Sequence, residues 1–275
     1  PEIVFEGGNA YLDNQGLLNT TEDLMLVAAN AQMSAHLFQG FNGTSAATAL
    51  AARLAGRIKY FNPNLSALSI RALMIHSAEW TDAMQDMFTK NGELEKDVLV
   101  HTCGYGIPNE RKAIVSQDDY VTFISESELE PFTQGSAEPK FARMHLYQMP
   151  WPSEILRELG EQDVIVKITL SYYVEPNPGN RGKMKKHSYQ SIRLNFELNQ
   201  PLEPLNRFQR RVSHLGEEEP MDNDGGRWRI GIKRRNQGSI SSDAIMCSAA
   251  ELADCNLLAI YPSSRWYKTR KSKAD

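Results

Sequence analysis

The sequence has few of the features that mark membrane, disulfide-bonded and zinc-binding proteins. It has three cysteines in 275 residues, Cys103, Cys247 and Cys255, and no CxxC pair. Three widely spaced thiols neither close a disulfide framework nor form a typical zinc site, so we expect reduced core residues in a cytoplasmic or similarly reducing compartment. No apolar run approaches the roughly 18 residues of a membrane-spanning helix. We therefore expect no membrane-spanning helix in this sequence, no membrane partner and no small disulfide-stapled domain.

The N-terminus lacks an initiator methionine, a basic leader and the apolar core of a signal peptide. The chain opens Pro-Glu-Ile-Val-Phe-Glu-Gly-Gly, which predicts that it begins inside a longer gene product. Hydrophobic residues make up 41% and charged residues 23% of the composition. These proportions are typical of a folded globular chain and not of a disordered one.

Charge is distributed unevenly along the chain. Residues 1–140 contain nine Lys and Arg against eighteen Asp and Glu, whereas residues 141–275 contain twenty-one against sixteen. Such a shift indicates two units with different surfaces. Between them, residues 125–140 lose apolar periodicity and are rich in Glu, Ser, Pro and Gly, as expected of a linker. We predict a first domain at 1–124, a linker at 125–140 and a second domain at 141–275.

The first part favours helices. Ser45–Phe61 is rich in Ala with apolar residues three and four apart, which predicts a helix packed closely against other backbone. An Asn-Pro-Asn breaker at 62–64 precedes a second predicted helix over about residues 66–80. Cys103–Asn109 is a glycine-punctuated turn, followed by a short run that ends at Val115.

The second part favours strands. Apolar and polar residues alternate, or β-branched and aromatic residues dominate, in four segments: Val164–Val174, Ser191–Leu198, Arg227–Lys233 and Asn256–Tyr261. Several strands joined by long turns predict an all-β sandwich or jelly roll.

The segment Asn42-Gly43-Thr44-Ser45 places a serine at the start of the predicted Ala-rich helix. The unpaired amides and the positive dipole end of a helix N-terminus favour an anion. If the Ser45 hydroxyl attacked a carbonyl carbon, the oxyanion would lie against the Ser45 amide, a donor of the kind that lowers acyl-transfer barriers. Gly43 would let a substrate backbone approach closely. A serine or threonine here is also a common helix N-cap without any catalytic role.

Four segments in order carry a family resemblance: Pro1–Val4, Asn42–Ala47, Asn62–Leu65 and Gly104–Asn109. Over about residues 1–116 they resemble the C-terminal half of the subtilisin-like serine peptidases, the subtilases. The resemblance implies an α/β fold with part of a parallel-sheet core. It also implies hydrolysis of peptide bonds in a peptide or protein substrate, through an acyl-enzyme on Ser45. We expect no cofactor, and we assign no metal, because no acidic loop has convincing ligand spacing for the calcium sites of subtilases.

The resemblance also implies that part of the active site lies outside this chain. In subtilases the catalytic Asp and His precede the nucleophile by a long way, but only 44 residues precede Ser45 here. The Asp, the His and the oxyanion-hole Asn are therefore expected upstream of Pro1, on a missing N-terminal half that acts as a partner. His36, with Asp13 or Asp23, is the local alternative, although a surface histidine is the simpler interpretation.

Other interpretations stay open. The chain is alternatively a non-catalytic peptide- or protein-interaction module on a subtilase-derived scaffold, or the Ser45 helix start binds phosphate or carboxylate without covalent chemistry. Ala49 lies where subtilases usually have proline. This difference bears on the subfamily to which the sequence is similar more than on the expected fold. Nucleic-acid binding is not favoured, because basic loops between strands are commonly solvated turns. The basic segments concerned are residues 181–186, 207–211, 233–235 and 268–273.

Overall fold

The computed structural model separates into two compact units, Pro1–Phe123 and Ile124–Asp275. The structure describes residues 1–32, 34, 36–115, 122–130, 144–174, 192–217, 226–235 and 238–264. Most of the expected linker, and the basic segments 181–186 and 268–273, lie outside these residues.

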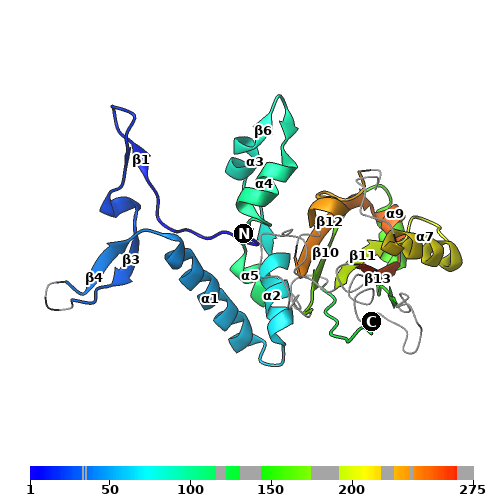
Figure 1. The fold of residues 1–275 in the computed structure, drawn as a ribbon. Helices are drawn as coiled ribbons and strands as arrows, with labels where there is room; N and C mark the ends of the chain where they lie inside the picture. The colour runs from blue at the N-terminus through cyan, green and yellow to red at the C-terminus, as the bar shows by residue number, and fades with distance from the viewer. Residues whose placement is uncertain are drawn as a thin grey trace, which may run out of the picture. The chain divides into compact units, whose positions relative to one another are not determined.

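The first unit consists of five α-helices and short strand pairs among its described residues. In Figure 1 the strands β1 to β4 lie near the start of the long helix α1, and α2 and α5 lie near its other end. The elements are β1 (Tyr11–Leu12), β2 (Leu18–Asn19), the 3-10 turn η1 (Glu22–Leu24), β3 (Leu26–Ala29), β4 (Phe38–Phe41), α1 (Thr44–Phe61), α2 (Ala67–His76), β5 (Ala78–Glu79), α3 (Asp82–Met87), β6 (Thr89–Lys90), β7 (Glu93–Leu94), α4 (Lys96–Cys103), β8 (Ile107–Pro108) and α5 (Glu110–Ile114).

Both predicted helices of this unit are present. Helix α1 ends at Phe61, directly before the Asn-Pro-Asn breaker. Helix α2 begins after Ser66, whose hydroxyl accepts a hydrogen bond from the Ser69 amide at 3.2 Å, the usual N-cap arrangement. It ends at His76, short of the predicted residue 80, because Ala78 and Glu79 pair with Pro108 and Ile107 as strands β5 and β8.

The core of the first unit is small and lies at the C-terminal end of α1. Only Leu54 and Ile58 of α1 are buried, and α1 packs against α2 and α5. The close packing expected for the whole Ala-rich helix is therefore wrong for its first turns, where the side chains are exposed or half-buried. The other buried hydrophobic residues of this unit are Leu73, Ile75, Ala78, Trp80, Leu99, Cys103 and Ala113.

Every named strand pair among the described residues is antiparallel. The parallel pairing expected of a partial subtilisin-like core is thus not seen within this part of the chain. Strands β3 and β4 are joined by residues 30–37, fewer than the dozen or so that a parallel crossover needs, so they form a hairpin. Mixed helices and small sheets remain consistent with an α/β region.

The second unit has two antiparallel sheets and several helices. Strands β10 and β12 form one sheet, and β11, β13 and β9 form the other in that order. Residues from both sheets share one core cluster, which includes Val166, Phe196, Ile245 and Leu258. The elements are β9 (His145–Gln148), α6 (Ser153–Leu159), β10 (Asp163–Ser171), β11 (Ile192–Leu198), α7 (Leu205–Glu217), α8 (Ile232–Arg235), β12 (Ile240–Ser248), α9 (Ala249–Ala253) and β13 (Leu257–Ser264).

Three of the four expected strands of this unit appear, as β10, β11 and β13. The expectation for Arg227–Lys233 is wrong: Trp228 makes only an isolated bridge to Ile245, and the chain then turns into α8. Its amides are used differently, because Ile230 and Gly231 donate to the Asp243 carboxylate at 2.8 and 2.9 Å. Helices α6, α7 and α9 stand beside the sheets, so an all-β sandwich stays a prediction.

A buried ionic cluster joins β11, β12 and α8. The Arg235 guanidinium donates to Asp243 Oδ2 at 3.2 Å and to the Phe196 carbonyl at 2.8 Å. It also lies over the rings of Phe196 and Trp228, 4.1 and 4.3 Å from their centroids. Burial raises the pKa of the neighbouring Glu197 above its ordinary value, although Arg235 and Arg211 act in the opposite direction.

The three cysteines are unpaired and buried, as the composition predicts. Burial raises the pKa of the Cys255 thiol to about 11. Among the described residues, no helix is both long enough and apolar enough to cross a bilayer. Within the same residues, no group of His, Cys, Asp and Glu is placed to hold a metal ion.

Candidate active site

The site is built where strand β4 turns into helix α1. Gly43 is the residue directly before the helix and has φ 148°, a backbone conformation that L side chains rarely adopt. Because it has no side chain, Gly43 cannot cap the first amides of α1 as a serine or aspartate would. The Gly43 carbonyl accepts a hydrogen bond from the Ala46 amide at 3.0 Å, which closes the first turn.

Ser45 lies in this first turn and is exposed. Neither its hydroxyl nor its amide is hydrogen-bonded to any described residue of the chain, and the same holds for the Thr44 amide. These amides belong to the group that every α-helix leaves without an intrahelical acceptor, and the helix dipole adds a partial positive charge there. Ser45 thus presents a hydroxyl and an amide in the same helix turn, neither of them hydrogen-bonded to a described residue.

The other predicted loop residues are held by contacts. Thr44 is exposed, and its carbonyl accepts a hydrogen bond from the Thr48 hydroxyl at 3.1 Å. The Asn42 side-chain amide donates to the Asn9 carbonyl at 3.2 Å. The Gly43 amide donates to the Gly7 carbonyl at 2.6 Å. Asn42 and Gly43 therefore fasten the turn to an earlier segment of the chain.

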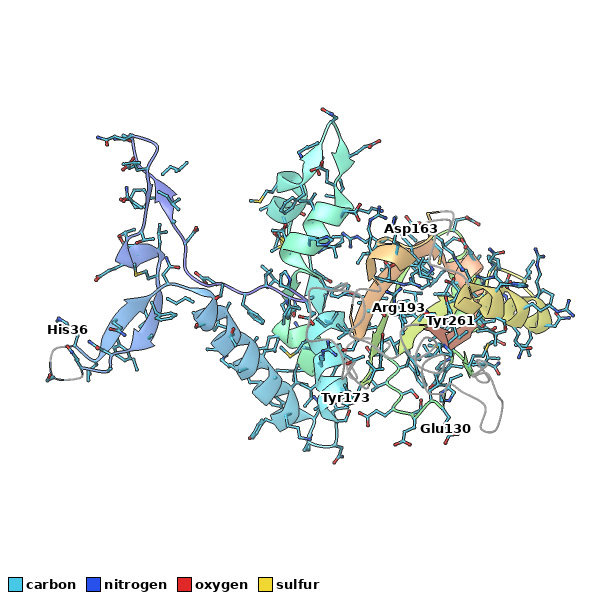
Figure 2. The ribbon with its side chains drawn as sticks, in the orientation of Figure 1. His36, Glu130, Asp163, Tyr173, Arg193 and Tyr261 are labelled. Carbon is cyan, nitrogen blue, oxygen red and sulfur yellow. The ribbon has the colours of Figure 1, made fainter. Side chains whose placement is uncertain are left out.

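No histidine or carboxylate of the described chain is hydrogen-bonded to Ser45. His36 is exposed and lies in the loop that joins β3 to β4, away from the start of α1 (Figure 2). Asp13 is engaged in its own hairpin, where Oδ1 accepts from the amides of Gln15 and Leu17, each at 2.9 Å. Asp23 lies in η1. The local alternative to an external triad is therefore not assembled here.

The glycine turn predicted at 103–109 packs against the first residues of the chain. The Val4 amide donates to the Gly106 carbonyl at 3.0 Å, and the Tyr105 amide donates to the Glu2 carbonyl at 2.8 Å. Gly104 has φ 58°, and a Cβ atom there would collide with the carbonyl oxygens of Pro1 and Glu2. Two of the segments that carry the resemblance, far apart in sequence, are thus in direct contact.

Sequence reasoning missed the segment Gly7–Asn9, which contacts the turn at Asn42 and Gly43. The available signal was the adjacent glycine pair at 7 and 8, because paired glycines commonly mark a close approach of two backbones. Nothing in the local pattern identifies which backbone approaches, since the partner lies more than thirty residues further along the chain.

Comparison with known proteins agrees with the resemblance. Residues 1–106 match the model of the subtilase family. Across 230 residues the chain is 26% identical to a protein of Sinorhizobium fredii named "Uncharacterized protein y4bN", covering 81% of this chain and 48% of that relative. The chain thus spans about half the length of this relative. No solved structure matches the chain.

Proposed function

We propose that this chain, whose residues 1–106 match the subtilase family, supplies the nucleophile of a subtilisin-like serine endopeptidase. The observation that carries the proposal is the exposed Ser45 in the first turn of α1, whose amide has no acceptor among the residues that the structure describes. In this proposal the substrate is a peptide or protein.

The chemistry follows from the place of Ser45. The Ser45 Oγ attacks the peptide carbonyl carbon while a histidine takes the hydroxyl proton, and the oxyanion of the tetrahedral adduct lies against the Ser45 amide. Collapse of the adduct breaks the C–N bond, the histidine passes the proton to the leaving amine, and an ester on Ser45 remains. Water then attacks the ester, which releases the acid and restores the serine.

The histidine and its aspartate are proposed to come from another stretch of the whole protein. This inference is supported by the length of the relative, of which the chain covers 48%. The same stretch is the proposed partner of the first unit, where many apolar side chains of residues 1–60 are exposed. They are Tyr11, Leu12, Leu17, Leu18, Val27, Leu37, Phe38, Phe41 and Tyr60.

The second unit is proposed to be an appended β-sandwich. Support comes from its two antiparallel sheets, whose residues meet in one apolar cluster, with α6, α7 and α9 added around them. In subtilisin-like enzymes such a domain would brace the catalytic unit or present substrates. A cytoplasmic or similar reducing location is also proposed, supported by three buried, unpaired thiols.

Active-site labelling of the whole protein that contains this chain tests the proposal. A fluorophosphonate reacts with a serine only where the serine is activated, so peptide mapping is expected to find the adduct on Ser45. Ser45→Ala should abolish labelling without loss of folding, because the change adds no bulk to an exposed position. Ser34→Ala, an exposed loop serine of the same unit, is the matched control and should label normally.

Modification of another serine contradicts the proposed nucleophile. A folded whole protein that takes no label favours the non-catalytic interaction module instead. The Asp and His segments of the whole protein, read from its sequence, separate the same two functions.

A further inference from the structure

We propose that the segment Gly7–Asn9 is a positioning clamp that holds the turn before α1, and with it Ser45, in place. The contacts of the clamp are observed in the structure. Its effect on the reactivity of Ser45 rests on the proposed function. The clamp is defined as residues 7–9, and it contacts the turn at Asn42 and Gly43.

Two hydrogen bonds join the clamp across more than thirty residues of sequence. The Gly43 amide donates to the Gly7 carbonyl at 2.6 Å, and the Asn42 side-chain amide donates to the Asn9 carbonyl at 3.2 Å. The first bond uses the backbone amide of Gly43, and the second uses the side chain of Asn42. Together they fix both the position and the direction of the chain as it enters α1.

The two glycines of the clamp leave no space for a side chain. A Cβ atom on Gly7 would lie 3.1 Å from the Gly43 carbonyl oxygen. Gly8 has φ 89°, and a Cβ atom there would collide with Asn42 Oδ1 and lie 2.7 Å from Asn42 Cγ. The approach of the two segments is thus as close as backbone allows, and Asn42 packs directly over Gly8.

The start of α1 has few other restraints. Gly43 offers no side-chain cap, the first turns of α1 bury no side chain, and the amides of Thr44 and Ser45 have no acceptor among the described residues. A helix start with neither cap nor packing frays readily. The clamp therefore sets where the Ser45 hydroxyl and amide point, and displacements of about 1 Å in such groups can lower rates about 100-fold.

Two alanine substitutions at glycines with positive φ distinguish an effect of the clamp contact from an effect of backbone strain. Gly8→Ala introduces a methyl group against Asn42. Gly16→Ala is the matched control, because Gly16 has a similar φ of 76° in the β1–β2 hairpin but no atom within 4 Å of its added Cβ. Both substitutions place alanine at a positive φ and so strain the backbone in the same way. Only Gly8→Ala also places a methyl group against the turn at Asn42.

The measurements are made on the whole protein that contains this chain. Hydrogen exchange of the amides at 42–45 reports the Gly43 bond, since the Thr44 and Ser45 amides have no acceptor in the described part of the chain. The rate and final extent of fluorophosphonate labelling report Ser45. We expect Gly8→Ala to speed exchange at Gly43 and slow labelling by about 10- to 100-fold, with the same final labelled fraction as the parent. Gly16→Ala should leave both readouts unchanged.

Asn42→Ala provides a second route if Gly8→Ala does not fold. It deletes the bond to Asn9 and should by itself raise exchange at Gly43. Asn42→Ala also removes Oδ1 and Cγ of Asn42, the two atoms nearest to a methyl group on Gly8. Adding Gly8→Ala to Asn42→Ala should therefore slow labelling by a smaller factor than adding Gly8→Ala to the parent protein.

Equal effects of Gly8→Ala and Gly16→Ala on both readouts, or unchanged exchange at Gly43 in Gly8→Ala and Asn42→Ala, would overturn the clamp. If Ser45 of the parent protein takes no label, the proposed function fails, while exchange at Gly43 still decides the clamp. A fall in the final labelled fraction, rather than in the rate, would identify Gly8→Ala as merely destabilising.

Discussion

The guanidinium of Arg235 and the carboxylate of Asp243 are both fully buried, so neither charge is solvated by water. Asp243 also accepts the amides of Ile230, Gly231 and Ala244. Asp243→Ala would remove the nearer carboxylate of the buried Arg235, whose pair with Glu197 is longer at 4.0 Å, and would leave three amides without that acceptor. We expect the free energy of unfolding of the second unit to fall by about 3–5 kcal/mol, measured by urea denaturation.

An exposed ion pair of the same unit supplies the comparison. Arg157 donates to Asp254 at 3.2 Å, with 60% and 30% of their side chains exposed. Solvent screens such a pair, so Asp254→Ala should change the same free energy by no more than about 1 kcal/mol. If Asp243→Ala and Asp254→Ala lowered the free energy of unfolding by similar amounts, burial would not be the reason that the Arg235–Asp243 pair stabilises the unit.

At the scale of elements, the short helix α9 depends on the residue that caps its N-terminus, Ser248. The Ser248 hydroxyl accepts a hydrogen bond from the Glu251 amide at 3.2 Å, and the helix buries Ala249, Leu252 and Ala253. Ser248→Ala leaves that amide without its acceptor. We expect a loss of about 1 kcal/mol in the free energy of unfolding, measured by thermal or chemical denaturation.

The matched change inside a helix is Ser213→Ala in α7. There the hydroxyl donates to the Gln209 carbonyl of the preceding turn, which already has its helical donor. Alanine is the better helix former, so stability should stay within about 0.5 kcal/mol of the parent or rise slightly. A loss as large as that of Ser248→Ala would argue against capping as the cause.

At the scale of the whole molecule, the apolar surface of the first unit should decide solution behaviour. Leu18 and Val27 are 73% and 78% exposed, and they belong to the short hairpins β1–β2 and β3–β4. Exposed apolar strands of this kind favour association. We expect the isolated chain to self-associate with rising concentration, measured by light scattering, and Leu18→Glu with Val27→Glu to reduce that association.

Tyr173→Glu in the second unit is the control, since Tyr173 is 83% exposed but lies outside the hairpins. Its association should match that of the parent chain. Addition of the separately produced remainder of the protein should suppress association by covering the hairpins. A chain that stays monomeric and monodisperse at every concentration would contradict the proposed partner.

Elements defined by local pattern could be predicted closely. The Ala-rich run at 45–61 became α1, and the β-branched run at 164–174 became β10, because periodicity and propensity act over a few neighbouring residues. The alternating run at 227–233 did not become a strand. There a distant side chain, Asp243, takes the amides that a neighbouring strand would have used.

The sequence by itself determined that a serine follows a glycine at the start of an Ala-rich helix, and that the ordered motifs around it resemble a subtilase. Only the tertiary structure showed that Ser45 is exposed, that β3 and β4 form an antiparallel hairpin, and that Gly7–Asn9 holds the turn at Asn42. The physical reason is range: helix starts and strand periodicity depend on adjacent residues, whereas exposure and backbone contacts depend on residues brought together from distant parts of the chain.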